Sequence, residues 1–585
     1  MIWATVSWML TACEPGSPQL GGASPLSGKP ASGRVAPLSD AAFEGLPLDD
    51  QYRVINKLMA TLFTGLPVAE FYALDATEPL SRRRQDALRL SDIRTQLQLD
   101  LQAESRQQYD REIAGGTSTT MDDDGQALEV EPMFHFDGNR PKQMPLARMF
   151  HYPLSRDSFS QWMAWHLANT ILFSPAEEID SADITDVQNI FRRLDLGIMS
   201  GQSIRAMVAT HQNSVQNWRR FRSPEDNTRE MMEIYLGLFD RDADVPLASQ
   251  ACQDLYLTDE SDGYKLAYTD YPNTEAVLVL DRYVVNCRDF YDVVAGHPLL
   301  IPRVASVLVD YFFAGHSVED RLAITRSISD SQPVTFEDIF LAILFSETYL
   351  LDTERARSFE EGFLPMAKRL QWDAHPDLFR GMISGNGGLS RTHMTEMGWP
   401  SMSFKLGRVA SIPLDSLSFG NYHKALRESL MLDSRRWRTA LGVQQPAQPS
   451  PTPVEPLKAD ATAREIASHQ SELAAYHQAV SELSDEERAL HQRELAAYEI
   501  EAELYRHIDD LTIPQLVDYL FLTAVQRRAS VEERRELINL FYAHGHLDAE
   551  YANAFARAGR QDDIALITLD YLSRLPELYY LPRLR

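Results

Sequence analysis

Three carboxylates stand at helical spacing in the segment SPEDNTREMMEIYLGLFD. Spacings of four and three residues bring Asp226, Glu230 and Glu233 onto adjoining turns of one helix face. Carboxylates grouped in this way could bind a cation or move a proton, with Arg229 and His297 as further candidate catalytic residues. The same residues also fit a capped amphipathic helix with internal ion pairs, in which Arg229 pairs with Glu233. The pattern favours this second interpretation.

His297 precedes Pro298 at the expected start of another helix. A lone histidine in this place is more often a capping or core residue than a ligand. The sequence also lacks the motifs of several familiar sites: the GxSxG nucleophile elbow, the GxxxxGK[ST] phosphate loop, the HExxH zinc motif and the GxGxxG dinucleotide motif. No particular reaction follows from the sequence alone.

Asp240, Asp242 and Asp244 have the alternate spacing of the first ligands in a calcium loop. Such a loop needs glycine and glutamate at the positions that Val245 and Ala251 occupy in this chain. We therefore expect neither a metal site nor a cofactor. The 84 acidic residues outnumber the 56 basic ones, and the formal net charge of -28 repels nucleic acid at long range.

Helices must position these residues, because helical periodicity dominates the sequence. Thr335 and Asp338 form a capping box ahead of an apolar stripe. Pro302 fits the first turn of another helix, which Gly315 would end. Strand patterning is confined to residues 264–285, which allow one short β-ribbon. The sequence therefore predicts an all-α protein.

The main part of this all-α protein is a large multi-helix body at residues 38–441. A C-terminal helical part at residues 511–585 completes the body. With 44% hydrophobic residues, the chain can bury a sizeable core. Four tryptophans could line a sugar-binding groove, but at helical spacing they are more often core residues: Trp162, Trp165, Trp218 and Trp372.

The chain has three cysteines. Cys252 and Cys287 lie in one region and would form a disulfide in an oxidising compartment. Closing this loop of roughly 34 residues would stabilise the fold by about 3–4 kcal/mol. The alternative is two buried free thiols, since cysteine often serves as a small core residue.

The chain opens with MIWATVSWMLTAC, an uncharged apolar run that ends in small residues and a cysteine. Residues 1–13 resemble a bacterial lipoprotein signal, in which Cys13 is lipidated and becomes the new N-terminus. The alternative is a plain buried N-terminal segment. Residues 14–37 are rich in Gly, Pro and Ser and predict a flexible tether. We expect a protein of the periplasm or cell surface, anchored to a bacterial membrane by the lipidated Cys13 only.

Residues 442–457 form a Pro-rich linker, and residues 458–510 differ in character from the body. The segment HQSELAAY recurs as HQRELAAY after 22 residues, which equals two eleven-residue helical repeats. Ser484 and Glu487 predict a capping box between the copies, so the chain would reverse there into an antiparallel helical hairpin. Its narrow, Ala-rich stripe would pack against its own second arm or against a second protein.

Several motifs resemble those of one known family when they are taken in order. SPEDNTREMMEIYLGLF and the following ADVPLASQACQDLYLT place Asn227, Arg229 and Glu230 at positions comparable to a family signature. HPLLIPRVASVLVDYFFAG is similar to a His-Pro helix start that ends in an aromatic pair. FEDIFLAILFSETYLLD, GWPSMSFKLGR and DSLSFGNYHK resemble three later segments. The family is the bacterial "domain of unknown function 1800" family.

This resemblance runs, with gaps, over residues 159–427 and 511–584. It implies a predominantly helical protein that is secreted or associated with the cell envelope. Members have no established activity and are often encoded beside a sulfatase-like partner family. The resemblance therefore implies a location and a fold, and it does not supply a reaction.

Two functions follow from these expectations. The favoured one is a binding or assembly component at the bacterial cell envelope, which contacts an envelope protein partner through the hairpin at residues 458–510. The alternative is a hydrolase-type enzyme that acts on an extracellular polymer through the carboxylate cluster.

Overall fold

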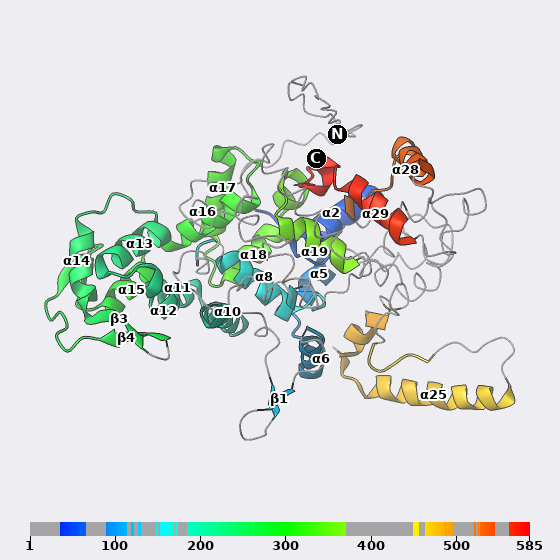
Figure 1. The fold of residues 1–585 in the computed structure, drawn as a ribbon, viewed down its shortest axis with the longest axis horizontal. Helices are drawn as coiled ribbons and strands as arrows, with labels where there is room; N and C mark the ends of the chain where they lie inside the picture. The colour runs from blue at the N-terminus through cyan, green and yellow to red at the C-terminus, as the bar shows by residue number, and fades with distance from the viewer. Residues whose placement is uncertain are drawn as a thin grey trace, which may run out of the picture.

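The computed structural model is mostly helical, with only small two-stranded antiparallel sheets, which confirms the predicted fold class (Figure 1). The structure describes residues 35–65, 89–113, 119–121, 127–129, 148–149, 152–168, 170–172, 184–260, 263–369, 449–454, 462–485, 487–492, 494–495, 498, 517, 520–521, 524–525, 527–543 and 561–585. Several predicted features lie outside this part of the chain: the signal with Cys13, most of the tether and linker, Trp372, GWPSMSFKLGR and DSLSFGNYHK.

The helices with eight or more residues carry most of the fold. They are α2 (Leu48–Thr61), α6 (Ala103–Ile113), α8 (Arg156–Ala168), α10 (Ile184–Met199), α11 (Ile204–Gln212), α13 (Pro224–Leu236), α14 (Asp244–Ala251), α15 (Cys287–Gly296), α16 (Leu300–Phe312), α17 (Val318–Asp330), α18 (Phe336–Leu344), α19 (Phe359–Arg369), α25 (Ala463–Glu482), α28 (Val531–Ala543) and α29 (Gln561–Leu572). The shorter ones are α1 (Asp40–Glu44), α5 (Leu90–Gln96) and α12 (Val215–Arg220).

The strands form four separate pairs. They are β1 (Thr119–Met121) with β2 (Ala127–Glu129), β3 (Leu255–Glu260) with β4 (Gly263–Tyr268), β5 (Val277–Val279) with β6 (Arg282–Val284), and β7 (Arg355–Ala356) with β8 (Tyr580–Leu581). The predicted ribbon is therefore two hairpins, since β4 pairs back onto β3 and β5 pairs with β6. Leu280 and Asp281 connect the second hairpin with positive φ angles of 50° and 61°, as a tight two-residue turn requires.

The chain is attached to the body from Val35 onward, within the last residues of the predicted tether. The Val35 N–H donates to Ser327 Oγ at 3.2 Å, and Pro37 forms an antiparallel bridge with Ser346. These contacts reach α17 and the end of α18, so the chain enters the fold beside elements that lie about 300 residues later.

An aromatic cluster joins α8, α16 and α18 in the core. The Trp162 and Phe340 rings meet edge-to-face with 5.1 Å between their centroids, and Phe312 lies 6.1 Å from Phe340. Trp162 Nε1 also donates to the Thr61 carbonyl at 2.7 Å, which adds α2 to the cluster. Trp165 and Trp218 are fully buried as well, so the preference for core tryptophans is confirmed at these three positions.

Helix α18 begins as predicted, because Thr335 Oγ1 accepts the Asp338 N–H and Asp338 accepts the Thr335 N–H. The preceding helix α16 ends differently from the prediction. Its last turn is capped by Phe313, not by Gly315. Gly315 instead lies against the backbone of Glu354, where a Cβ atom would stand 2.1 Å from the carbonyl oxygen.

No single described helix is both long and apolar enough to cross a membrane. Helices α15 and α16 meet these requirements only as a pair, and a bend of 66° separates them.

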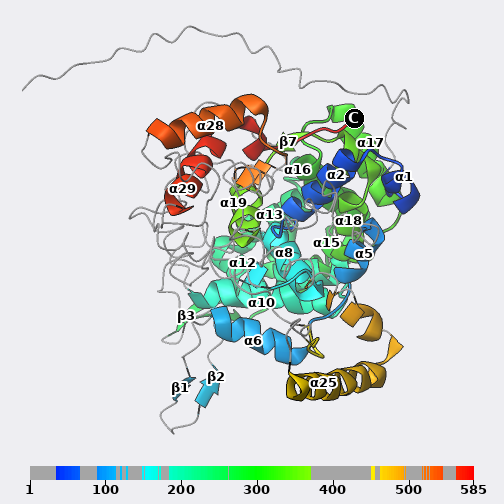
Figure 2. The ribbon, with the colours of Figure 1, turned by 90° about the vertical axis from the view of Figure 1, so that its right-hand side faces the viewer.

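The C-terminal segment packs against α2 and against the segment around β7. Strand β8 pairs with β7, and the buried Lys57 of α2 donates to the carbonyls of Thr353 and Pro582. Arg585 adds an ion pair with Asp352 at 2.8 Å. Helices α28 and α29 lie together at the upper side of the molecule in both views (Figures 1 and 2).

Candidate functional site

Helix α13 carries the predicted carboxylates and begins where the sequence predicts. Ser223 Oγ accepts the Asp226 N–H at 3.1 Å, and Pro224 occupies the first helical position, where its missing N–H costs nothing. The helix ends at Gly237, whose φ of 68° lets its N–H reach the Glu233 carbonyl at 3.0 Å. Both ends are thus fixed by local sequence.

Arg229 pairs differently from the prediction. Its guanidinium donates to Asp242 Oδ1 at 2.8 Å and lies 3.6 Å from Glu225, whereas Glu233 acts on it only at longer range. Asp242 reaches Arg229 from the loop after the helix, and Glu225 lies one turn before it. Asp226 is exposed, and partial burial raises the pKa of its carboxyl against the opposing effect of Arg220 and Arg229.

His297 caps the C-terminus of α15 and does not join this cluster. Its Nδ1 accepts the Leu299 N–H at 3.2 Å, so the ring serves the turn between α15 and α16. Burial, with Arg241 as the next contributor, lowers the pKa of His297. Among the described residues, no hydrogen bond or ion pair joins His297 to the carboxylates of α13. No group of three or more His, Cys, Asp or Glu in the described ranges could hold a metal ion.

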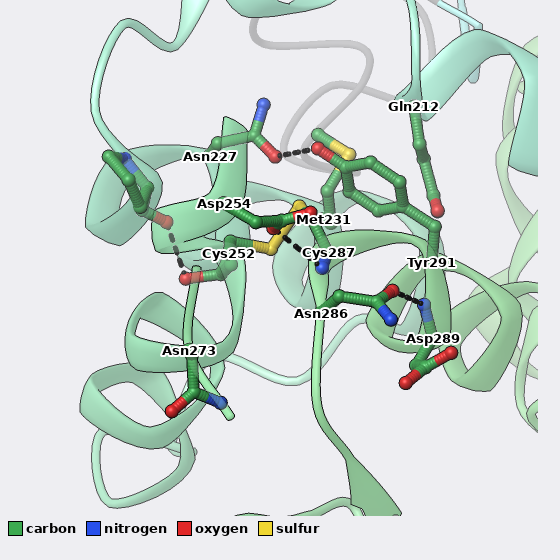
Figure 3. Close-up of a disulfide and its surroundings, with 12 residues drawn as sticks. Gln212, Asn227, Met231, Cys252, Asp254, Asn273, Asn286, Cys287, Asp289 and Tyr291 are labelled. Atoms are coloured by element: carbon green, nitrogen blue, oxygen red, sulfur yellow. Dashed lines mark hydrogen bonds between the residues drawn. A yellow bond between two sulfur atoms is a disulfide. The ribbon is translucent and has the colours of Figure 1, made fainter. Parts of the chain in front are cut away.

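Asn227 belongs to the buried face of α13 and not to the exposed polar cluster. Its Oδ1 accepts the phenolic hydroxyl of Tyr291 at 2.8 Å, which ties α13 to α15 (Figure 3). The sequence could have predicted this placement, because Asn227 precedes Met231 by four residues and Tyr235 by eight. Residues at this spacing lie on one face of a helix. All of these side chains are buried.

A disulfide links Cys252 to Cys287 beside this contact, as predicted (Figure 3). Both cysteines are fully buried, and the bond joins the end of α14 to the first residue of α15. Asp254 accepts the Cys287 N–H at 3.0 Å, and Asn286 caps α15 by accepting the Asp289 N–H at 2.9 Å. The bond therefore fixes the start of the helix that carries Tyr291.

Sequence patterns did not predict the buried basic group between α10, α11 and α12. Arg193 of α10 donates from Nη1 to Gln216 Oε1 on α12 at 3.2 Å, and its Nε and Nη2 atoms are buried. His211 of α11 is buried nearby, and burial together with Arg193 and Arg220 lowers its pKa well below the ordinary value. No local motif marks these residues, because Arg193, His211 and Gln216 lie on three different helices.

Helix α25 is a second candidate site, because none of its 20 residues is buried and each is at least partly accessible. It lies outside the packed helices in both views of the molecule (Figures 1 and 2). Thr462 and Glu465 form a capping box at its start. Its larger side chains follow a heptad pattern: Ile466, His469, Leu473, Tyr476, Val480 and Leu483.

The second arm of the hairpin covers one end of this heptad seam. The capping box of Ser484 and Glu487 is present as predicted, with bonds of 2.8 and 3.3 Å. Beyond it, His491 Nε2 and Tyr476 OH form a hydrogen bond of 3.0 Å, so the chain reverses between them. At the other end of the seam, Ile466 and Leu473 remain 39% and 37% exposed.

No family model, curated protein or solved structure matches the chain. The resemblance to the family described above stays a prediction.

Proposed function

We propose that this chain is an extracytoplasmic lipoprotein that serves as a binding or assembly component of a bacterial cell envelope. Its contact with a protein partner is the hairpin at residues 458–510. The observation that carries this proposal is the bare helix α25, which buries none of its residues. Helices draw most of their stability in proteins from packing of an apolar face, so this seam is suited to a further helix.

The charge of the hairpin defines the chemistry of that partner. Residues 458–510 include 13 acidic and 5 basic residues, and Ile466 and Leu473 form a narrow apolar strip among them. A complementary surface is a helix with small or aliphatic residues in its seam and Lys or Arg beside it. Such a partner would bind faster at low ionic strength than at high.

The disulfide supports the envelope location. Disulfides persist in oxidising compartments and are rare where thiols are kept reduced. Lipidation of Cys13 would hold the body at the membrane through the following Gly/Pro/Ser-rich segment. In this proposal the membrane contact is the lipid alone, and the hairpin faces a protein.

The alternative hydrolase has less support from the contacts. Arg229 is bound to Asp242, and His297 serves the turn after α15, so these two residues do not assist the carboxylates of α13. The capped start of α13 and the surface ion pairs of Arg229 with Glu225 and Asp242 fit an amphipathic helix. Glu230 and Glu233 are half-buried on the same helix.

The test is in-cell crosslinking from a photoreactive residue that replaces Ile466. The expected result is one defined crosslinked partner, which is lost when Leu473→Glu places a charge in the seam. Ser471→Glu is the matched control, because it adds the same charge on the far side of α25 and should leave the crosslink intact. Equal crosslinking in both variants would overturn the hairpin as the contact.

A separate measurement tests the anchor. Wild-type protein should partition with membranes and into detergent, and Cys13→Ala should remain in the aqueous phase or retain an uncleaved N-terminus. An aqueous, unacylated wild-type protein in the cytosol would overturn the envelope location without bearing on the hairpin contact.

A further inference from the structure

The guanidinium of Arg193 offers an unused binding edge inside the protein. Its Nη1 is anchored by Gln216, while Nε and Nη2 are buried and have no hydrogen-bond acceptor in the described part of the chain. These two nitrogens form the side of the arginine fork that binds a carboxylate with two parallel hydrogen bonds. The Gln216 contact therefore holds the fork while leaving its binding edge open.

No acidic side chain among the described residues pairs with Arg193. Burial lowers the pKa of Arg193 to about 10, so the group keeps its positive charge at neutral pH. A buried cation without a counter-ion is costly, and proteins normally pair such a charge or neutralise it. At neutral pH the Arg193 guanidinium stays protonated, so its charge needs a partner. The described residues do not supply an acid, which indicates that this partner comes from outside them.

His211 supplies a second polar group at the same place. Neither ring nitrogen of His211 has a hydrogen-bond partner in the described ranges, although the side chain is buried. The Ser214 hydroxyl, which caps α12, donates to the His211 carbonyl at 2.7 Å, so His211 lies beside the start of the helix that carries Gln216. A neutral imidazole carries one N–H, so His211 can donate one hydrogen bond to a bound anion.

The unsatisfied polar atoms continue from His211 toward the disulfide. Both amide atoms of Gln212 are buried without a partner, and so is Asn227 Nδ2, within the described part of the chain. Gln212 and Tyr291 are both among the residues drawn around the disulfide (Figure 3). Each unpaired buried polar group costs roughly 1–3 kcal/mol, so several of them in one region indicate a site for a polar ligand.

We propose that Arg193, together with His211, binds the carboxylate of a small organic anion between α10, α11 and α12. One charge on the ligand matches Arg193, which no acid among the described residues neutralises, and the planar carboxylate matches its Nε and Nη2 edge. A phosphate dianion matches this edge less well, because the single Arg193 fork offers two parallel hydrogen bonds and one charge. This site is separate from the hairpin and does not depend on the proposed function.

The experiment measures urea unfolding of the full chain with sodium acetate as the probe and sodium chloride at equal ionic strength as the reference. At ten times the dissociation constant, a ligand that binds only the folded state raises the folding equilibrium constant about tenfold. We expect acetate to produce this stabilisation in the wild type and to lose it in Arg193→Met. Arg192→Met is the matched control, since Arg192 is the exposed neighbour on the same helix and should retain the acetate effect.

A further variant and a further anion complete the experiment. If Arg193→Met does not fold, Arg193→Lys retains the charge without the fork and should weaken the acetate effect at least tenfold. Stabilisation by sodium phosphate but not by acetate would overturn the carboxylate assignment. Absence of any anion-specific effect in the wild type, or an equal effect in Arg193→Met, would overturn the site.

Discussion

The ion pair of Arg355 and Glu361 is fully buried, with two hydrogen bonds between the side chains. Tyr311, Phe312 and Tyr349 surround the guanidinium, with its carbon 4.9, 5.5 and 5.9 Å from the ring centroids. Removing one charge of such a pair leaves the other buried without compensation, which typically costs about 3–5 kcal/mol.

We therefore expect Glu361→Gln to lower the free energy of unfolding by about 3–5 kcal/mol, measured by urea denaturation. Asp242→Asn is the matched control, because it removes an acid from the exposed pair with Arg229 and should cost less than about 1 kcal/mol. Equal losses in the two variants would show that burial does not strengthen the Arg355 pair.

The buried His166 should make the free energy of unfolding depend on pH. Burial, followed by the charge of Arg355, holds the pKa of His166 well below its ordinary value. Below about pH 6.5 the unfolded chain therefore binds a proton that the folded protein does not bind. Stability is complete above that pH and falls by about 1.4 kcal/mol per unit as the pH drops toward the folded pKa.

In His166→Phe this loss should disappear, because phenylalanine keeps the packing against Trp162 and Phe312 without titrating. Urea unfolding at pH 7.5 and 5.5 should show a difference about 1.4 kcal/mol smaller than in the wild type. His477→Gln changes an exposed histidine of α25 and should keep the wild-type difference. The same difference in all three proteins would contradict the prediction.

At the scale of the element, Gly315 and Gly296 form a natural pair for comparison. A Cβ atom at Gly315 would stand 2.1 Å from the Glu354 carbonyl oxygen, whereas nothing lies within 4 Å of one at Gly296. We expect Gly315→Ala to lower the free energy of unfolding by about 1–3 kcal/mol, since backbone must move to relieve the overlap. Gly296→Ala should leave stability unchanged or slightly raised, as urea denaturation of both variants would show.

Sequence patterns predicted the elements whose causes are local. Ser223, Thr335 and Ser484 cap helices as expected, because each cap depends on a residue three positions away. The disulfide was predicted because two cysteines lie in one region and an oxidising compartment was expected. The partner of Arg229, the pairing of β4 with β3 and the role of Gly315 depend on contacts that no local pattern encodes. The environment of Arg193 was missed for the same reason, since its surroundings come from two other helices.

At the scale of the whole molecule, the stability of the helical body should not depend on the hairpin at residues 458–510. Because α25 buries none of its residues, replacing residues 461–509 by a short Gly-Ser linker should change the free energy of unfolding by less than about 1 kcal/mol. Urea denaturation followed by fluorescence is the measurement, with far-UV circular dichroism to confirm the expected loss of helix. A broad or strongly shifted transition would mean that the hairpin is part of the cooperative unit.

The contacts of Lys57 set a condition on how this protein is made. Its ammonium group is satisfied by the Pro582 carbonyl, which is synthesised 525 residues later, as well as by Thr353. A nascent chain that still lacks residues 580–585 therefore has no partner for β7 and one acceptor too few for a cation that the finished protein encloses. These contacts form only after residues 580–585 have left the ribosome, so this part of the fold is completed long after α2 has been synthesised.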